Sequence, residues 1–172
     1  NYEKFRTKFG VEIQTPNLDR LAERGTYFDA AYATTPLCNP SRAAIVTGQT
    51  PFETGIFGNT EPFYRFLDPA DTLHAAFARE GYVTGTVGKV YHQPNLTRDF
   101  SRDIIDDNLP ASGLLREGFG LPFRSGPAPE RYSDADFFDH DAASGAIEFL
   151  NGQSGDTPFM LSVGFFRPHS PM

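Results

Sequence analysis

The chain has 172 residues, a length typical of one domain with its own hydrophobic core. Its net charge of −7 excludes the basic surface that nucleic acids and anionic membranes require, so we expect no nucleic-acid partner. The single cysteine excludes an intrachain disulfide. No apolar run approaches the roughly 20 residues that cross a bilayer, so no membrane span is expected.

The first predicted helix runs from Thr15 to about Arg24. Thr15 is a suitable N-cap, Pro16 fits the first helical position, and Gly25 follows as a stop signal. The segment TYFDAAYA, residues 26–33, follows this helix, and we predict a strand there.

A second helix is predicted directly after Cys38, with Asn39 as its cap and Pro40 in its first turn, and it ends at Gly48. Free N–H groups at a helix start favour an anion, either a thiolate or a bound oxyanion. Arg42, one turn into this helix, adds a fixed positive charge. The alternative is that Cys38 is a small buried hydrophobic residue, as most free cysteines are.

Two further helix–strand pairs follow. The helix Asp71–Glu80, capped by Asp71, precedes a strand at Tyr82–Val87, and a helix from Ser133 to about Leu150 precedes a strand of the buried parallel type at Phe159–Phe166. Residues from about 94 to 132, rich in Pro, Gly, Asp and Arg, are predicted to form a long surface loop or insertion. This loop either helps to shape a substrate pocket or is a solvated excursion.

This alternation predicts an α/β fold with a mostly parallel sheet flanked by helices on both faces. In such sheets ligands bind beyond the carboxyl ends of the strands. Cys38, Lys89, His92 and His169 each come just after a predicted strand, so we expect them to converge at one edge. Taken singly, the lysine could be solvated and the histidines could be capping or surface residues.

The segment CNPSRAAIVTG resembles the signature of the type I sulfatases, which the chain matches at Cys38, Pro40, Ser41, Arg42, Thr47 and Gly48. The segment before Cys38 resembles the family's lead-in, GYVTGTVGKVYH resembles its second motif, and FMLSVGFFRPHSP resembles its strand with a sulfate-facing histidine. The sequences of the second and third motifs are most similar to those of the iduronate-2-sulfatase branch. The resemblance covers most of the chain outside residues 94–132.

The resemblance implies an alkaline-phosphatase-like fold that hydrolyses sulfate esters of sugars or glycans. Cys38 would be converted to formylglycine by a maturation enzyme that reads the motif formed by Cys38, Pro40, Ser41 and Arg42. Arg42 would hold and polarise the formylglycine. Lys89 and His92 would bind the sulfate and the leaving-group oxygen, and His169 would line the same pocket.

The resemblance also implies calcium in the complete protein, because a hard cation suits carboxylate ligands. Formylglycine at Cys38 would be a ligand only if the remaining ligands are present, and we expect those outside this sequence. Residues 1–172 are therefore expected to be a partial catalytic domain, incomplete at both ends. The family implies a periplasmic, secreted or lysosome-like location, although no signal peptide is recognisable.

Two other functions remain open on the sequence. A phosphodiesterase or phosphonate monoester hydrolase of the same superfamily would use the same nucleophile on phosphorus. A catalytically inert, anion-binding fragment is the alternative of a different class.

Overall fold

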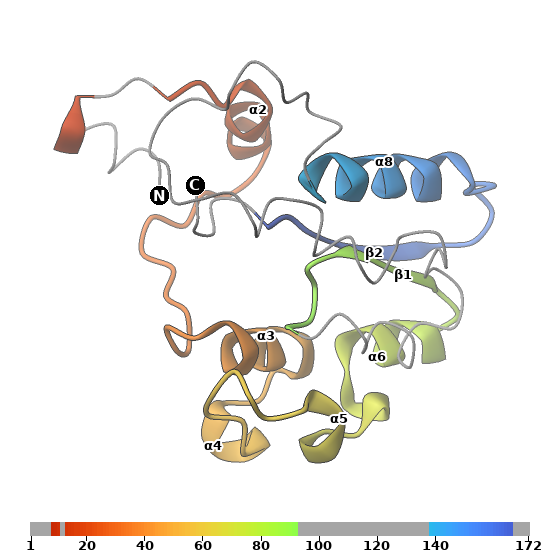
Figure 1. The fold of residues 1–172 in the computed structure, drawn as a ribbon. Helices are drawn as coiled ribbons and strands as arrows, with labels where there is room; N and C mark the ends of the chain where they lie inside the picture. The colour runs from red at the N-terminus through yellow and green to blue at the C-terminus, as the bar shows by residue number, and fades with distance from the viewer. Residues whose placement is uncertain (1–7, 11–12, 93–137, 167–172) are drawn as a thin grey trace. The chain divides into compact units, whose positions relative to one another are not determined.

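The computed structural model describes residues 8–10, 13–92 and 138–166 of the chain, which divides into two units at residues 1–33 and 34–172 (Figure 1). In the first unit, helix α2 spans Pro16–Arg24, with Thr15 in the N-cap position and Gly25 after its last turn. The Thr15 hydroxyl donates to the Asp19 carboxylate at 3.1 Å. The predicted first helix is therefore confirmed.

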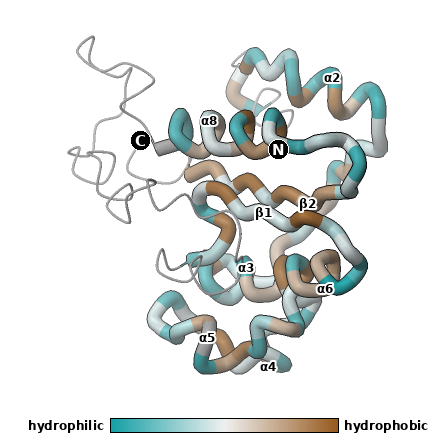
Figure 2. The backbone as a smooth tube through the Cα atoms, turned by 90° about the vertical axis from the view of Figure 1, so that its right-hand side faces the viewer, coloured by the Kyte–Doolittle hydropathy of each residue, from teal (hydrophilic) through white to brown (hydrophobic). Residues whose placement is uncertain are grey.

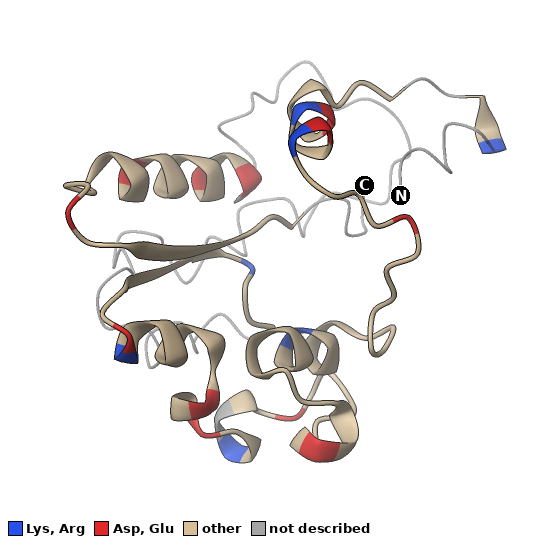
Figure 3. Ribbon diagram, turned by 180° about the vertical axis from the view of Figure 1, so that it is seen from behind, with Lys and Arg blue, Asp and Glu red and all other residues tan. Residues whose placement is uncertain are grey.

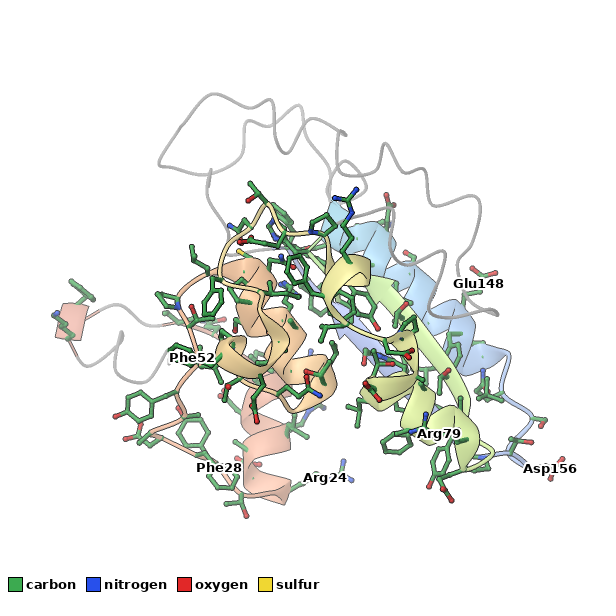
Figure 4. The ribbon with its side chains drawn as sticks, turned by 90° about the horizontal axis from the view of Figure 1, so that it is seen from below. Arg24, Phe28, Phe52, Arg79, Glu148 and Asp156 are labelled. Atoms are coloured by element: carbon green, nitrogen blue, oxygen red, sulfur yellow. The ribbon has the colours of Figure 1, made fainter. Side chains whose placement is uncertain are left out.

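The predicted strand at residues 26–33 is wrong. The structure describes all eight of these residues and leaves them outside any helix or strand. Their aromatic side chains are exposed, with Phe28 (labelled in Figure 4) at 75% and Tyr32 at 91%. A preference for strand reflects packing on a half-buried pleated surface, and these exposed side chains have no such packing.

The second unit is built on two parallel strands. Strand β1 (Val83–Gly88) pairs with β2 (Phe159–Gly164) in a register that runs from Val83↔Phe159 to Gly88↔Gly164. Helix α8 (Phe138–Asn151) packs on both strands from one side, and α6 (Leu73–Arg79) packs on β1 from the other (Figures 1 and 2). The predicted parallel sheet with helices on both faces is confirmed.

Strand β2 is less buried than its apolar sequence predicts. Phe159 is 42% exposed and Val163 is 37% exposed, although β2 is largely hydrophobic in Figure 2. A fully buried parallel strand needs neighbours on both edges and cover on both faces. Within the described residues the sheet has two strands, so that cover is incomplete.

Helix α6 begins one residue later than predicted. Its cap is Thr72, whose hydroxyl accepts the N–H of Ala75 at 3.2 Å, and not Asp71. Asp71 instead ends a short 3₁₀ helix, η1 (Pro69–Asp71). Because the threonine hydroxyl satisfies a free N–H of the first turn, it sets the boundary.

One prediction lies wholly outside the described residues, and another lies partly outside them. The first is the long loop at about 94–132, and the second is the start of the last helix, residues 133–137. The rest of that helix is confirmed as α8.

Three helices and the segment after β1 enclose the core of the second unit. Helix α3 (Cys38–Thr47) ends at Gly48 with φ +71°, α4 (Pro51–Thr54) begins with a capping box, and α5 (Phe63–Phe66) follows. The buried cluster consists of Ala43, Val46, Ile56, Phe63, Leu67, Val90 and Tyr91. This cluster therefore fixes α3 against the chain that leaves β1. Phe52, on the outside of α4 in Figure 4, is not part of it and is 87% exposed.

In the part of the chain that the structure describes, no helix combines the length and the apolar character needed to cross a membrane.

Two glycines allow the carboxyl ends of the strands to come close together. Gly88 has φ +73°, and a Cβ there would overlap the carbonyl oxygen of Gly164 and lie 3.0 Å from the Cβ of Ala142. A Cβ at Gly164 would overlap the carbonyl of Lys89. The chain can turn away from the sheet at Lys89 because neither strand end carries a side chain.

We predict that Gly88→Ala destabilises the protein more than Gly81→Ala does. Gly81 has φ +83°, and its Cβ would meet no described atom within 4 Å, so alanine there costs only the positive φ, about 1–2 kcal/mol. Gly88→Ala adds the overlap with Gly164, about 1–3 kcal/mol more. Urea unfolding of both variants measures the difference, and equal losses would contradict it.

Candidate active site

Cys38 is the first residue of helix α3, and its side chain is half-buried. This confirms the predicted position at a helix start, where free N–H groups favour negative charge. Because residues 26–33 form no strand, however, Cys38 does not follow a strand as predicted. The helix, and not the sheet, positions it.

Asn39 is not the cap of α3, as the sequence suggested, because Leu37 occupies the N-cap position. The Asn39 side chain is only 1% exposed, and its Nδ2 donates to the carbonyl oxygens of Gly58 at 3.0 Å and Glu61 at 2.8 Å. Its backbone N–H donates to Oδ1 of Asn59 at 3.0 Å. Asn39 therefore ties residues 58–61 to the helix start that carries Cys38.

Arg42 connects α3 to the segment that follows β1. Its Nη1 donates to the carbonyl oxygen of Lys89 and, at 3.1 Å, to that of Val90. Burial lowers the pKa of Arg42, and the charge of Cys38 opposes this by raising it. The guanidinium thus has a structural role, and its role at the nucleophile stays a prediction.

Lys89 lies directly after β1, as predicted, and is 9% exposed. Its backbone N–H donates to the carbonyl of Gly164 at 2.7 Å, and its Nζ lies 4.5 Å from the centre of the Phe166 ring. Burial lowers the Lys89 pKa most, the charge of Cys38 raises it, and the nearby Arg42 lowers it. The Lys89 ammonium therefore makes a cation–π contact with Phe166.

Cys38, Arg42 and Lys89 therefore form one electrostatic group. The charge of Cys38 acts on both cations, although they come from different elements, α3 and the end of β1. Figure 3 shows basic positions on α3 and where the chain leaves β1. Two partly desolvated cations beside a helix N-terminus are suited to binding an oxyanion at residue 38.

The remaining predicted residues are placed in part. His92 is half-buried in the segment that continues from Lys89, whereas His169 lies outside the described residues. In the modification motif, Pro40 is buried and Ser41 is half-buried, and the Ser41 N–H donates to the carbonyl of Leu37 at 3.1 Å.

The sequence of the chain was compared with known protein families. The sequence model of the family described as sulfatase matches residues 5–172. The chain belongs to the sulfatase family. Membership of this family is consistent with the α/β fold, with the motif around Cys38, and with the two cations, Arg42 and Lys89, that gather near the start of α3.

Curated relatives of this sulfatase-family chain are similar along most of its length. A sulfatase of Formosa agariphila is 31% identical over 93% of this chain and 35% of its own length. Iduronate 2-sulfatase of Mus musculus is 28% identical over 92% of this chain and 31% of its own. Arylsulfatase A of Bos taurus is 46% identical over 44% of this chain and 15% of its own. The chain thus spans about a third of the length of the first two relatives.

The described residues differ in how well they fit the two groups that the family implies. Residue 38 suits formylglycine, because it is half-buried at the start of α3, and Arg42 on the same helix bonds the backbone of Lys89. Calcium has no such support, since no group of three or more His, Cys, Asp or Glu side chains gathers within residues 8–10, 13–92 and 138–166. The described residues alone do not form a calcium site.

We predict that Asn39→Ala destabilises the protein by about 2–4 kcal/mol, because the partly buried carbonyls of Gly58 and Glu61 lose their donor. Asn17→Ala, which removes an exposed amide on α2, should change the unfolding free energy by less than about 0.5 kcal/mol. Denaturant unfolding of both variants tests this. Similar small losses in both would show that the Asn39 side chain does not hold residues 58–61.

Proposed function

We propose that the protein hydrolyses sulfate esters of sugars or glycans, with residue 38 acting as formylglycine derived from Cys38. The observation that carries the proposal is that Arg42, one turn into the helix that begins at residue 38, bonds the backbone of the buried Lys89, so that two cations gather at the start of this helix. The relatives' names support the substrate class, since they include iduronate 2-sulfatase and an ulvan-active sulfatase.

The roles of the residues follow from their positions. As a hydrated aldehyde, residue 38 would supply an oxygen nucleophile for attack on sulfur. Arg42 holds its charge beside that residue while its Nη1 bonds two backbone carbonyls, so the guanidinium has little freedom to move. Lys89 would bind sulfate oxygens and offset the charge that develops during transfer.

The leaving oxygen needs a proton, and histidine is suited to donate one near neutral pH. His92 is a candidate because it follows Lys89 in the same short segment and is half-buried. His169, outside the described residues, is the other candidate. We propose that one of the two is the general acid, and that calcium is bound by the complete protein.

Conversion of Cys38 also requires a maturation enzyme, which we propose as a partner that recognises Pro40 and Arg42. We predict that the peptide containing residue 38, from protein made in its native host, is lighter than the thiol form by about 18 Da. Cys38→Ala should lack both this form and all sulfate ester hydrolysis. An unmodified thiol in protein that hydrolyses 4-nitrophenyl sulfate would contradict the assigned nucleophile.

We predict that Lys89→Met lowers kcat for 4-nitrophenyl sulfate about 100- to 1,000-fold, because the charge that develops on the sulfate loses the cation that offsets it.

Burial lowers the Lys89 pKa, so the lysine loses its charge at a lower pH than an exposed lysine does. Wild-type activity should therefore fall on the alkaline side, and Lys89→Arg should move that fall to higher pH.

Lys8→Met, a change at an exposed lysine, is the matched control and should leave the pH profile unchanged.

A comparison of an aryl sulfate with an aryl phosphate diester separates a sulfatase from a phosphodiesterase. Faster hydrolysis of the diester than of the sulfate would overturn the proposed reaction. Both assays use protein expressed with any further sequence that its gene encodes.

A further inference from the structure

A buried histidine joins three elements beneath the candidate site. His74, on α6, is 1% exposed, and both of its ring nitrogens are hydrogen-bonded. Its Nε2 lies 2.9 Å from the hydroxyl of Ser162 on β2, and its Nδ1 lies 3.1 Å from the hydroxyl of Tyr91. A helix, a strand and the segment after β1 thus meet at one imidazole.

The protonation states make this chain of bonds self-consistent. Burial lowers the pKa of His74 and raises that of Tyr91 to about 12, so the imidazole is neutral and the phenol keeps its proton. A neutral imidazole donates from one nitrogen and accepts at the other. Each hydroxyl can donate or accept, so both bonds are satisfied with either tautomer.

These polar groups lie beside an apolar core. Tyr91 is 4% exposed, belongs to the buried cluster around α3, and has its ring 5.2 Å from that of Phe63 in an edge-to-face arrangement. A phenylalanine would fill nearly the same space without a polar atom. A chain of buried polar groups costs free energy unless every member is hydrogen-bonded. The main advantage of this chain over apolar residues is therefore that it permits a single arrangement of the three elements.

The hydrogen bonds of His74 fix the backbone position of residues 89–92. This segment has neither helical nor strand structure, so its backbone depends on contacts with other elements. Lys89 is held at its backbone by Gly164 and Arg42, and Tyr91 is two residues further along. The bond to His74 is the anchor at the far end, immediately before His92.

We propose that His74, Tyr91 and Ser162 are positioning residues that hold Lys89 and His92 at the site of residue 38; the role of Lys89 itself rests on the proposed function. None of the three is assigned contact with the substrate. Among the described residues, the Ser162 hydroxyl connects to residues 89–92 through the imidazole of His74. Removal of this hydroxyl, which lies on β2, should therefore disturb Lys89.

The test compares Tyr91→Phe and Ser162→Ala, which remove one hydroxyl from each side of His74. Tyr82→Phe is the matched control for the first, since Tyr82 precedes β1 at the opposite end of the strand, and Ser144→Ala, exposed on α8, is the control for the second. The readouts are labelling of the Lys89 amine by acetic anhydride across pH, followed by mass spectrometry, and kcat and KM for 4-nitrophenyl sulfate.

In the wild type, Lys89 should be labelled more slowly than the exposed Lys8. In Tyr91→Phe and Ser162→Ala, its labelling rate and titration should move toward those of Lys8, and kcat/KM should fall about 10- to 100-fold. Both controls should behave as the wild type.

Unchanged Lys89 labelling in both variants would overturn the inference, even if activity fell. If the wild type hydrolyses no sulfate ester, the proposed function fails, and the labelling alone decides whether the three residues position Lys89. Thermal unfolding of each variant shows whether it is still folded at the labelling temperature. If Lys89 labelling rises only in variants that have lost their structure globally, the positioning role is rejected.

Discussion

The guanidinium of Arg42 connects the two parts of the candidate site. Its backbone belongs to the helix that begins at Cys38, and its acceptors are the carbonyls of Lys89 and Val90, 47 and 48 positions along the chain. An arginine fork has a fixed shape, so it transmits position as well as charge. The location of Lys89 relative to residue 38 therefore depends on a side chain that itself belongs to the site.

The segment that carries Lys89 is held by three elements of the second unit. The α3 side reaches it through Arg42, the sheet through the carbonyl of Gly164, and α6 through His74. An irregular segment would otherwise be among the most mobile parts of a domain. Anchors from three elements give it the rigidity that electrostatic catalysis requires.

Sequence patterns predicted the features that depend on neighbouring residues. Pro40 and Gly48 indicated a helix directly after Cys38, and the run before Lys89 indicated a strand. The patterns failed where contacts with residues distant in the sequence determine the local structure. Residues 26–33 have strand-like composition but no sheet contact, and the Asn39 side chain bonds carbonyls 19 and 22 positions away rather than a cap. His74 gave no signal, because its partners lie on other elements.

The bare strand ends at Gly88 and Gly164 have an evolutionary consequence. A methyl group at either position would meet backbone, which cannot swing aside as a flexible side chain can. A compensating replacement at the opposite glycine would only add a second obstacle. Substitutions in this chain that change which ligand it prefers are therefore expected on the surrounding loops and helices, and not at these two strand ends.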